Sequence, residues 1–132
     1  MTKKEFIISQ LAEYVQDPSR CAMVGDIRCN ITDDGKMCVA SKNYLPEIRK
    51  KHNLNFVLAI HRKYERDQSK YLIPTSVGIL DVNEWSLMQN IHDSIAKGIT
   101  YEYLLQALGF ESLEEFTQKC MEYGNVSSQK SI

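Results

Sequence analysis

The chain has 132 residues, of which 43% are apolar and 25% are charged. This length suits one ordinary domain that buries roughly two-thirds of its unfolded surface, and this composition excludes intrinsic disorder. No stretch approaches the roughly 20 apolar residues of a membrane span, and the apolar run in MTKKEFIISQL is too short for a signal peptide. We therefore expect a cytoplasmic protein, in its own cell or in that of a host, with no membrane partner and with its cysteines as free thiols.

Charge is segregated along the chain, although the net charge is only −1. The range 42–70 carries eight basic side chains against three acidic ones, whereas 81–124 carries eight acidic side chains against two lysines. The interpretation that we prefer is two solvated faces that complement each other within the fold. The alternative is a basic surface for an anionic partner and an acidic surface for a basic one.

A capping box marks the start of the first predicted helix, which spans 2–16. Thr2 and Glu5 stand at the N-cap and N3 positions, and apolar residues then recur at helical spacing. Asp17 and Pro18 end this helix, because a residue that precedes proline disfavours helical backbone.

Alternation of apolar and polar residues around an Asp-Asp-Gly turn at 33–35 predicts a β-hairpin over 27–40. In this register Ile31 pairs with Met37. Five residues then share one apolar face: Ile27, Cys29, Ile31, Met37 and Val39. We therefore expect Cys29 in the core and Cys38, on the opposite face, as the more accessible thiol.

A second helix and a second hairpin are predicted next. The helix covers 41–53 with Ser41 as its N-cap. The hairpin covers 54–80, turns at ERDQSK and pairs Tyr64 with Tyr71. Because a proline interrupts its last strand, we expect that strand at the edge of the sheet, where it could support a homodimer.

Three helical segments complete the chain: 81–98, 100–109 and 112–124. Asp81 and Ser112 each stand three residues before a glutamate, which predicts capping boxes at two of the three N-termini. The sequence therefore predicts a single α+β domain over 1–124, followed by a frayed tail over 125–132. Its small antiparallel sheet of two β-hairpins is covered by helices, in the order α-ββ-α-ββ-α-α-α.

Motifs for metal binding and catalysis are missing from the sequence. The cysteines form no C-x-x-C pair, and the histidines His52, His61 and His92 form no zinc motif, so we expect no bound metal. The chain also lacks G-x-x-x-x-G-K-[ST], G-x-G-x-x-G and G-x-S-x-G, so we expect no cofactor and no enzymatic activity. A pocket that uses His61 or His92 with a cysteine stays a third alternative, although His92 is better explained as a partly buried, hydrogen-bonded histidine.

The second hairpin is the strongest candidate binding surface. Its candidate residues are Arg62, Lys63, Tyr64, Arg66, Lys70 and Tyr71, with Lys50, Lys51 and His52 as neighbours. Aromatic rings interleaved with cations can stack on nucleotides, so RNA or single-stranded nucleic acid is one alternative. The plainer interpretation, which we prefer, is that the two tyrosines close the hairpin while the cations keep an edge strand soluble. A helix-turn-helix over 100–124 fails because its second helix carries three glutamates that phosphates would repel.

Three short motifs follow one another in a suggestive order. They are DGKMC at 34–38, His92-Asp93, and ITYEY at 99–103. In this order the chain resembles a group of small, uncharacterised proteins that are common in phages and bacterial genomes. The resemblance implies a mobile-element origin and no particular activity. We therefore expect a non-enzymatic phage or mobile-element factor that docks on a host protein or nucleoprotein through the basic hairpin.

Overall fold

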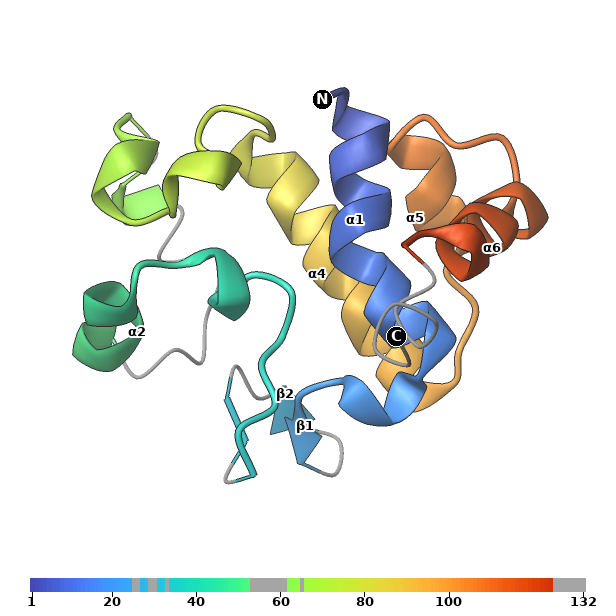
Figure 1. The fold of residues 1–132 in the computed structure, drawn as a ribbon, viewed down its shortest axis with the longest axis horizontal. Helices are drawn as coiled ribbons and strands as arrows, with labels where there is room; N and C mark the ends of the chain where they lie inside the picture. Colours follow the sequence, from blue (N-terminus) through green and yellow to red (C-terminus); the bar gives the residue numbers. More distant parts are fainter. Residues whose placement is uncertain (25–26, 29–30, 33, 53–61, 65, 125–132) are drawn as a thin grey trace.

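The structure is a computed structural model that describes residues 1–24, 27–28, 31–32, 34–52, 62–64 and 66–124. The described part is mostly helical (Figure 1). The α-helices are α1 (Lys3–Gln16), α2 (Pro46–His52), α4 (Val82–Lys97), α5 (Glu102–Ala107) and α6 (Leu113–Glu122). Four 3₁₀ turns are η1 (Pro18–Arg20), η2 (Ser41–Asn43), η3 (Gln68–Lys70) and η4 (Pro74–Ser76), and two short strands are β1 (Met23–Val24) and β2 (Ile27–Arg28).

The capping box predicted for α1 is present. The Glu5 amide donates to Thr2 Oγ1 at 3.1 Å, and the Thr2 amide donates to Glu5 Oε1 at 2.9 Å. At the other end, the Asp17 amide donates to the Glu13 carbonyl, and Pro18 opens η1. These contacts satisfy backbone groups at both helix ends, so the predicted boundaries of the first helix are confirmed.

Helix α1 packs against both α4 and α6 (Figure 1). On the α4 side, the Phe6 and Trp85 rings meet edge to face with centroids 5.7 Å apart. On the α6 side, the Gln16 side chain donates to the Cys120 carbonyl at 2.8 Å. The Phe116 ring of α6 lies edge-on to Phe110 at 5.1 Å, which joins α6 to the turn that follows α5. The core of the molecule therefore surrounds α1.

The three C-terminal helices lie where the sequence predicts them. Asp81 caps α4 by accepting from the Glu84 amide at 2.8 Å, and Gly98 ends this helix with a left-handed φ of 70°. Ser112 caps α6 by accepting from the Glu115 amide at 3.1 Å. Side-chain caps of this kind are local, so they are readable from sequence without knowledge of the tertiary fold.

The predicted α+β fold with two hairpins is wrong. In the first hairpin, Ile31 does bridge to Met37, and Gly35 takes the positive φ of 86° that the turn requires. Beyond that pair the ladder stops, because the chain turns after Met37 and enters η2. Strand β2 pairs instead with β1, in a ladder of two residues on each side.

The second hairpin is also wrong where the structure describes it. Residues 54–61, which hold its predicted first strand, lie outside the described residues. Arg62 and Lys63 are helical, and the described residues from Tyr64 to Leu80 form turns and the 3₁₀ segments η3 and η4, apart from the isolated bridge at Leu72. Pro74 is the first residue of η4 and Gly78 has a φ of 75°, and neither suits a continuous strand. The apolar residues of this range reach the core from turns, and their spacing resembles a strand by coincidence.

In the described part of this region, an extended contact joins two segments that the sequence assigns to different elements. Tyr44 bridges to Leu72 in antiparallel fashion, the Leu45 amide donates to the Tyr71 carbonyl at 2.8 Å, and the Ile73 amide donates to the Asn43 carbonyl at 2.9 Å. Because the chain forms the 3₁₀ turn η2 and Tyr44 after it is extended, the predicted helix over 41–53 begins at Pro46 rather than after Ser41. Proline suits that first helical position.

Two expectations concern parts or properties outside this packing. The frayed tail at 125–132 lies outside the described residues and stays a prediction, as does the single domain over 1–124. Within the described ranges, no helix combines the length and the apolar character needed to cross a membrane.

Truncation of the Phe116 side chain should test how much the α1–α6 core contributes. Phe116 is fully buried, whereas Met121 on the same helix is 53% exposed. We expect Phe116→Ala to lower the free energy of unfolding by about 3–5 kcal/mol, because it leaves a cavity, and Met121→Ala to change it by less than about 0.5 kcal/mol. Urea denaturation of both variants measures the difference, and equal losses would contradict this packing.

Candidate functional site

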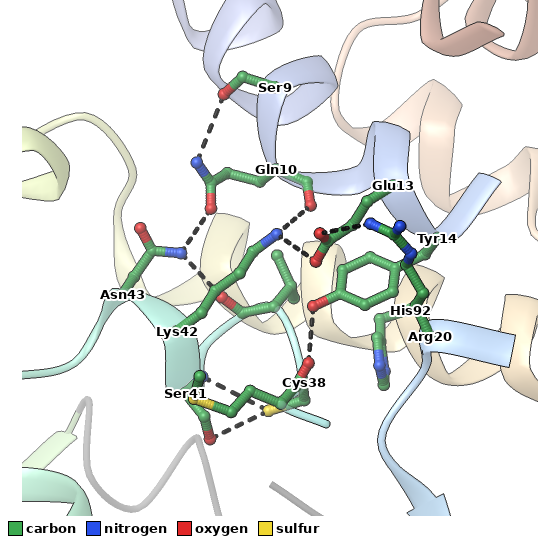
Figure 2. Close-up of polar contacts among 12 residues, drawn as sticks. Ser9, Gln10, Glu13, Tyr14, Arg20, Cys38, Ser41, Lys42, Asn43 and His92 are labelled. Atoms are coloured by element: carbon green, nitrogen blue, oxygen red, sulfur yellow. Dashed lines mark hydrogen bonds and ion pairs between the residues drawn. The ribbon is translucent and has the colours of Figure 1, made fainter. Parts of the chain in front are cut away.

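A partly buried polar cluster holds η2 against α1 (Figure 2). Lys42 of η2 donates to the Gln10 carbonyl at 2.8 Å and to the Glu13 carboxylate at 3.0 Å. Its ammonium group also lies 4.7 Å from the centroid of the Tyr14 ring. Burial lowers the pKa of Lys42, and the neighbouring Glu13 carboxylate opposes that shift. This lysine is therefore a packing and pairing group, although the sequence places it among the basic residues of 42–70.

Asn43 extends the cluster toward η4. Its side-chain amide donates to Gln10 Oε1 at 2.6 Å and to the Val39 carbonyl at 2.8 Å (Figure 2). The hydroxyl of Ser76 in turn donates to Asn43 Oδ1. The Asn43 side chain therefore connects α1, the turn before η2, and η4 through hydrogen bonds alone.

His92 lies at the centre of the α1–α4 contact and is fully buried. Its Nε2 accepts from the Ala22 amide at 3.1 Å, so the ring proton belongs on Nδ1, which donates to Asp93 Oδ1 at 2.9 Å. The Tyr14 ring meets the imidazole edge to face at 4.7 Å. The expectation of a hydrogen-bonded, structural histidine is confirmed, and its burial is complete rather than partial. The Nε2 atom thus seats the chain before β1 on α4, and Asp93 of the same helix holds the ring through Nδ1.

Cys38 is fully buried, so the prediction that it is the more accessible thiol is wrong. Its sulfur lies 3.2 Å from the Ser41 hydroxyl and accepts from the Ser41 amide at 3.4 Å (Figure 2). The prediction assumed strand alternation as far as residue 40, but the chain turns after Met37, and successive residues of a turn can face the same side. Ile31, expected on the buried face, is 45% exposed. Cys29 lies outside the described residues.

Four exposed basic residues gather around one shallow hollow of about 370 Å³. We call this feature the basic hollow, and it is lined by Arg62, Lys63, Tyr64, Arg66, Asp67 and Lys70. The structure thus brings together five of the six residues that the sequence assigns to the second hairpin, although they come from a helical end at Arg62 and Lys63 and from the turns that follow, and none comes from a strand. The sixth, Tyr71, is fully buried behind the hollow.

Gln68 fixes the backbone that carries the basic hollow. Its side-chain amide donates to the Leu80 carbonyl at 2.9 Å, and its Oε1 accepts from the Gly78 amide. The buried Tyr71 ring stacks on Tyr64 with centroids 5.6 Å apart. These contacts hold the turns of 62–70 against the segment that leads into α4. Sequence reasoning missed Gln68, because ERDQSK carries no signal beyond that of a polar turn.

The hollow is strongly cationic. Asp67, the carboxylate among its described lining residues, accepts from the Ser69 hydroxyl and lies 3.9 Å from the Lys70 ammonium group. Lys63 lies over the Tyr64 ring with its Nζ 5.6 Å from the centroid. Elsewhere, Lys50 and Lys51 are exposed on α2 and His52 is its last residue, and none of the described residues lining the hollow comes from α2. The predicted neighbours are therefore not part of the hollow.

Among the residues that the structure describes, no group of three or more His, Cys, Asp or Glu side chains could hold a metal ion. Compared with known proteins, the chain matches no family model, no curated protein and no solved structure.

The buried thiols should resist labelling in the native protein. Burial raises the pKa of Cys38 and raises the pKa of Cys21 and of Cys120 to about 12, so very little reactive thiolate forms at neutral pH. In a Cys29→Ser variant, we expect the three remaining thiols to react with a disulfide reagent at least about 100-fold more slowly than a model thiol, and all three to react after denaturation. One fast thiol in the native variant would show that the described burial is wrong.

Stability should fall at alkaline pH. Burial raises the pKa of Tyr71 to about 12 and raises those of Tyr14 and Tyr44 further, whereas tyrosines of the unfolded chain ionise near pH 10. The folded state therefore binds more protons than the unfolded state above about pH 10, and the free energy of unfolding decreases there as pH rises. Lys42, whose pKa burial lowers, acts in the opposite sense, but it is one group against three.

Urea denaturation at about pH 8, 10 and 11 measures this fall. The matched variant Tyr71→Phe removes one ionising group, so its stability should depend less steeply on pH than that of the native chain. A free energy of unfolding that stays constant up to about pH 11 would contradict the buried positions of these rings.

Proposed function

We propose that this chain is a non-enzymatic binding protein that uses the basic hollow to dock on an anionic surface of a partner protein or nucleoprotein. The observation that carries the proposal is the gathering of four exposed cations around one hollow, where the described lining residues include a single carboxylate, Asp67. Such a concentration of one charge attracts an oppositely charged surface, raises the rate of association and selects against cationic partners. The resemblance to small phage and bacterial proteins supports a bacterial cell as the source of the partner.

The position of the charges supports recognition rather than stability. Arg62, Lys63, Arg66 and Lys70 are all exposed, and exposed ion pairs contribute little to folding. By contrast, the cation that does support the fold, Lys42, is turned toward α1 and is engaged by Gln10 and Glu13. The chain thus separates a structural cation from the cations that remain available to a partner.

Binding of single-stranded nucleic acid receives less support. That alternative needs Tyr64 and Tyr71 as a stacking platform, but Tyr71 is fully buried and packs against Tyr44 at 5.8 Å and against Tyr64 at 5.6 Å. Of these two rings, only that of Tyr64 lines the hollow. A single half-buried ring is a weak platform for successive bases. Nucleic acid is therefore retained as an outcome of the experiment below.

Removal of three charges from the basic hollow should abolish capture of the partner. We expect the immobilised variant R62Q/K63Q/R66Q to lose proteins that the native chain captures from a bacterial lysate, as read by quantitative mass spectrometry. Because these side chains are exposed, the melting temperature should not change. Capture by the native chain should also weaken steeply with added salt, since the contact is electrostatic.

The matched control is K36Q/K97Q/K119Q, which removes the same number of charges away from the hollow. It should retain the captured proteins, and only proteins lost by the first variant and kept by the control count as partners. An identical captured set for all three chains would refute the proposal. Tight, salt-sensitive binding of mixed-sequence RNA or single-stranded DNA by the purified chain would replace the proposal with the nucleic-acid alternative.

A further inference from the structure

We infer that the group recognised by the basic hollow is a phosphate monoester, carried by the partner as a phosphorylated side chain or supplied as a free phosphorylated ligand. This inference rests on the proposed function and names the chemistry of the anion. It depends on three observations about the hollow: the kinds of cation, their pairing, and the support of their backbone.

The first observation is that two of the four cations are arginines. Arg62 and Arg66 both line the hollow, together with Lys63 and Lys70. A guanidinium group presents a planar fork of donors that matches two oxygens of a phosphate, and a lysine adds a compact positive charge. A dianionic phosphate monoester gains about twice the Coulomb energy of a carboxylate at the same distance. The set of side chains therefore favours a phosphate over an acidic residue.

The second observation concerns the charges that are already paired. Asp67 lies within ion-pair distance of Lys70 and also accepts from Ser69. Within the described part of the chain, which omits the neighbouring Glu65, no carboxylate lies within ion-pair distance of Arg62, Lys63 or Arg66. Asp67 thus orients one lysine of the rim, and both arginines face the space that a ligand would fill.

The third observation is the rigid support beneath the hollow. Gln68 ties the turn to the backbone of Gly78 and Leu80, and the stacked rings of Tyr64 and Tyr71 lie beneath it. These contacts restrict the described residues that carry the cations before a ligand binds, which lowers the entropic cost of association. A volume of about 370 Å³ is at the small end of ligand sites and suits one phosphorylated group.

Fluorescence anisotropy with three labelled peptides of one neutral sequence tests the inference. The peptides differ at one residue, which is phosphoserine, glutamate or serine. We expect the full-length chain to bind the phosphoserine peptide at least about tenfold more tightly than the glutamate peptide, because of the second charge and the fork geometry. Binding of the phosphopeptide should weaken between about pH 7 and pH 5, where the phosphate becomes a monoanion. Equal affinity for the phosphoserine and glutamate peptides would overturn the inference.

Two matched variants separate fork geometry from net charge. R62K/R66K keeps every charge but removes both guanidinium forks, and we expect it to lose at least about fivefold in affinity for the phosphoserine peptide. The control K36Q/K97Q/K119Q should bind this peptide as the native chain does. Unchanged binding by R62K/R66K would overturn the assignment of the arginines, since a diffuse charge effect does not distinguish the two cations.

Competition identifies the source of the phosphate. Unlabelled phosphopeptide and a nucleoside 5′-monophosphate each compete with the labelled phosphopeptide. If the nucleotide displaces the label at the lower concentration, the natural ligand is a free nucleotide. If the unlabelled phosphopeptide does so, the natural ligand is a phosphorylated protein. Inorganic phosphate should compete weakly in both cases. Failure of this inference is distinguishable from failure of the proposed function. If phosphatase treatment of the lysate leaves capture unchanged while R62Q/K63Q/R66Q still abolishes it, docking holds and the phosphate assignment falls.

Discussion

The hydrogen bonds that η2 makes to one turn of α1 are the constraint on which the rest of the structure depends. Lys42 reaches the Gln10 carbonyl and the Glu13 carboxylate, and Asn43 reaches the Gln10 side chain. These contacts fix the turns that follow the Ile31–Met37 bridge to α1. The same helix also packs against α4 and α6. In a partly buried setting each polar group must keep its partner, so the contacts hold this arrangement and disfavour alternatives.

The same anchoring determines where the basic hollow can lie. Asn43 is hydrogen-bonded to Ser76 and through its carbonyl to Ile73, so η2 and η4 are held side by side. The chain between them, including 62–70, must leave and return at that junction. Residues 66–70, which supply part of the lining of the hollow, lie on the opposite side of the molecule from α6, as the light green and red segments of Figure 1 show.

The sequence predicts the helices well and the extended parts poorly, for a physical reason. Thr2, Asp81 and Ser112 cap helices through contacts within three residues, so these helices are specified locally. The pairing of Tyr44 with Leu72 joins residues that lie far apart in the chain, and no local pattern specifies it. The strand alternation predicted over 27–40 does not extend to Cys38, because that residue is buried and follows the last paired residue, Met37. The composition of the basic hollow is readable from sequence, but its support by Gln68 is not.

The arrangement at Gln68 has a consequence for how this protein can change over generations. The cations of the hollow stand on a stretch whose attachment uses Gln68 and Tyr71, and neither of those residues lines the hollow. Substitutions at the exposed lining positions therefore leave the attachment intact and cost little in folding free energy. Ligand preference can drift while the scaffold is conserved. Relatives that share α1, α4 and the Gln68 attachment could recognise quite different partners.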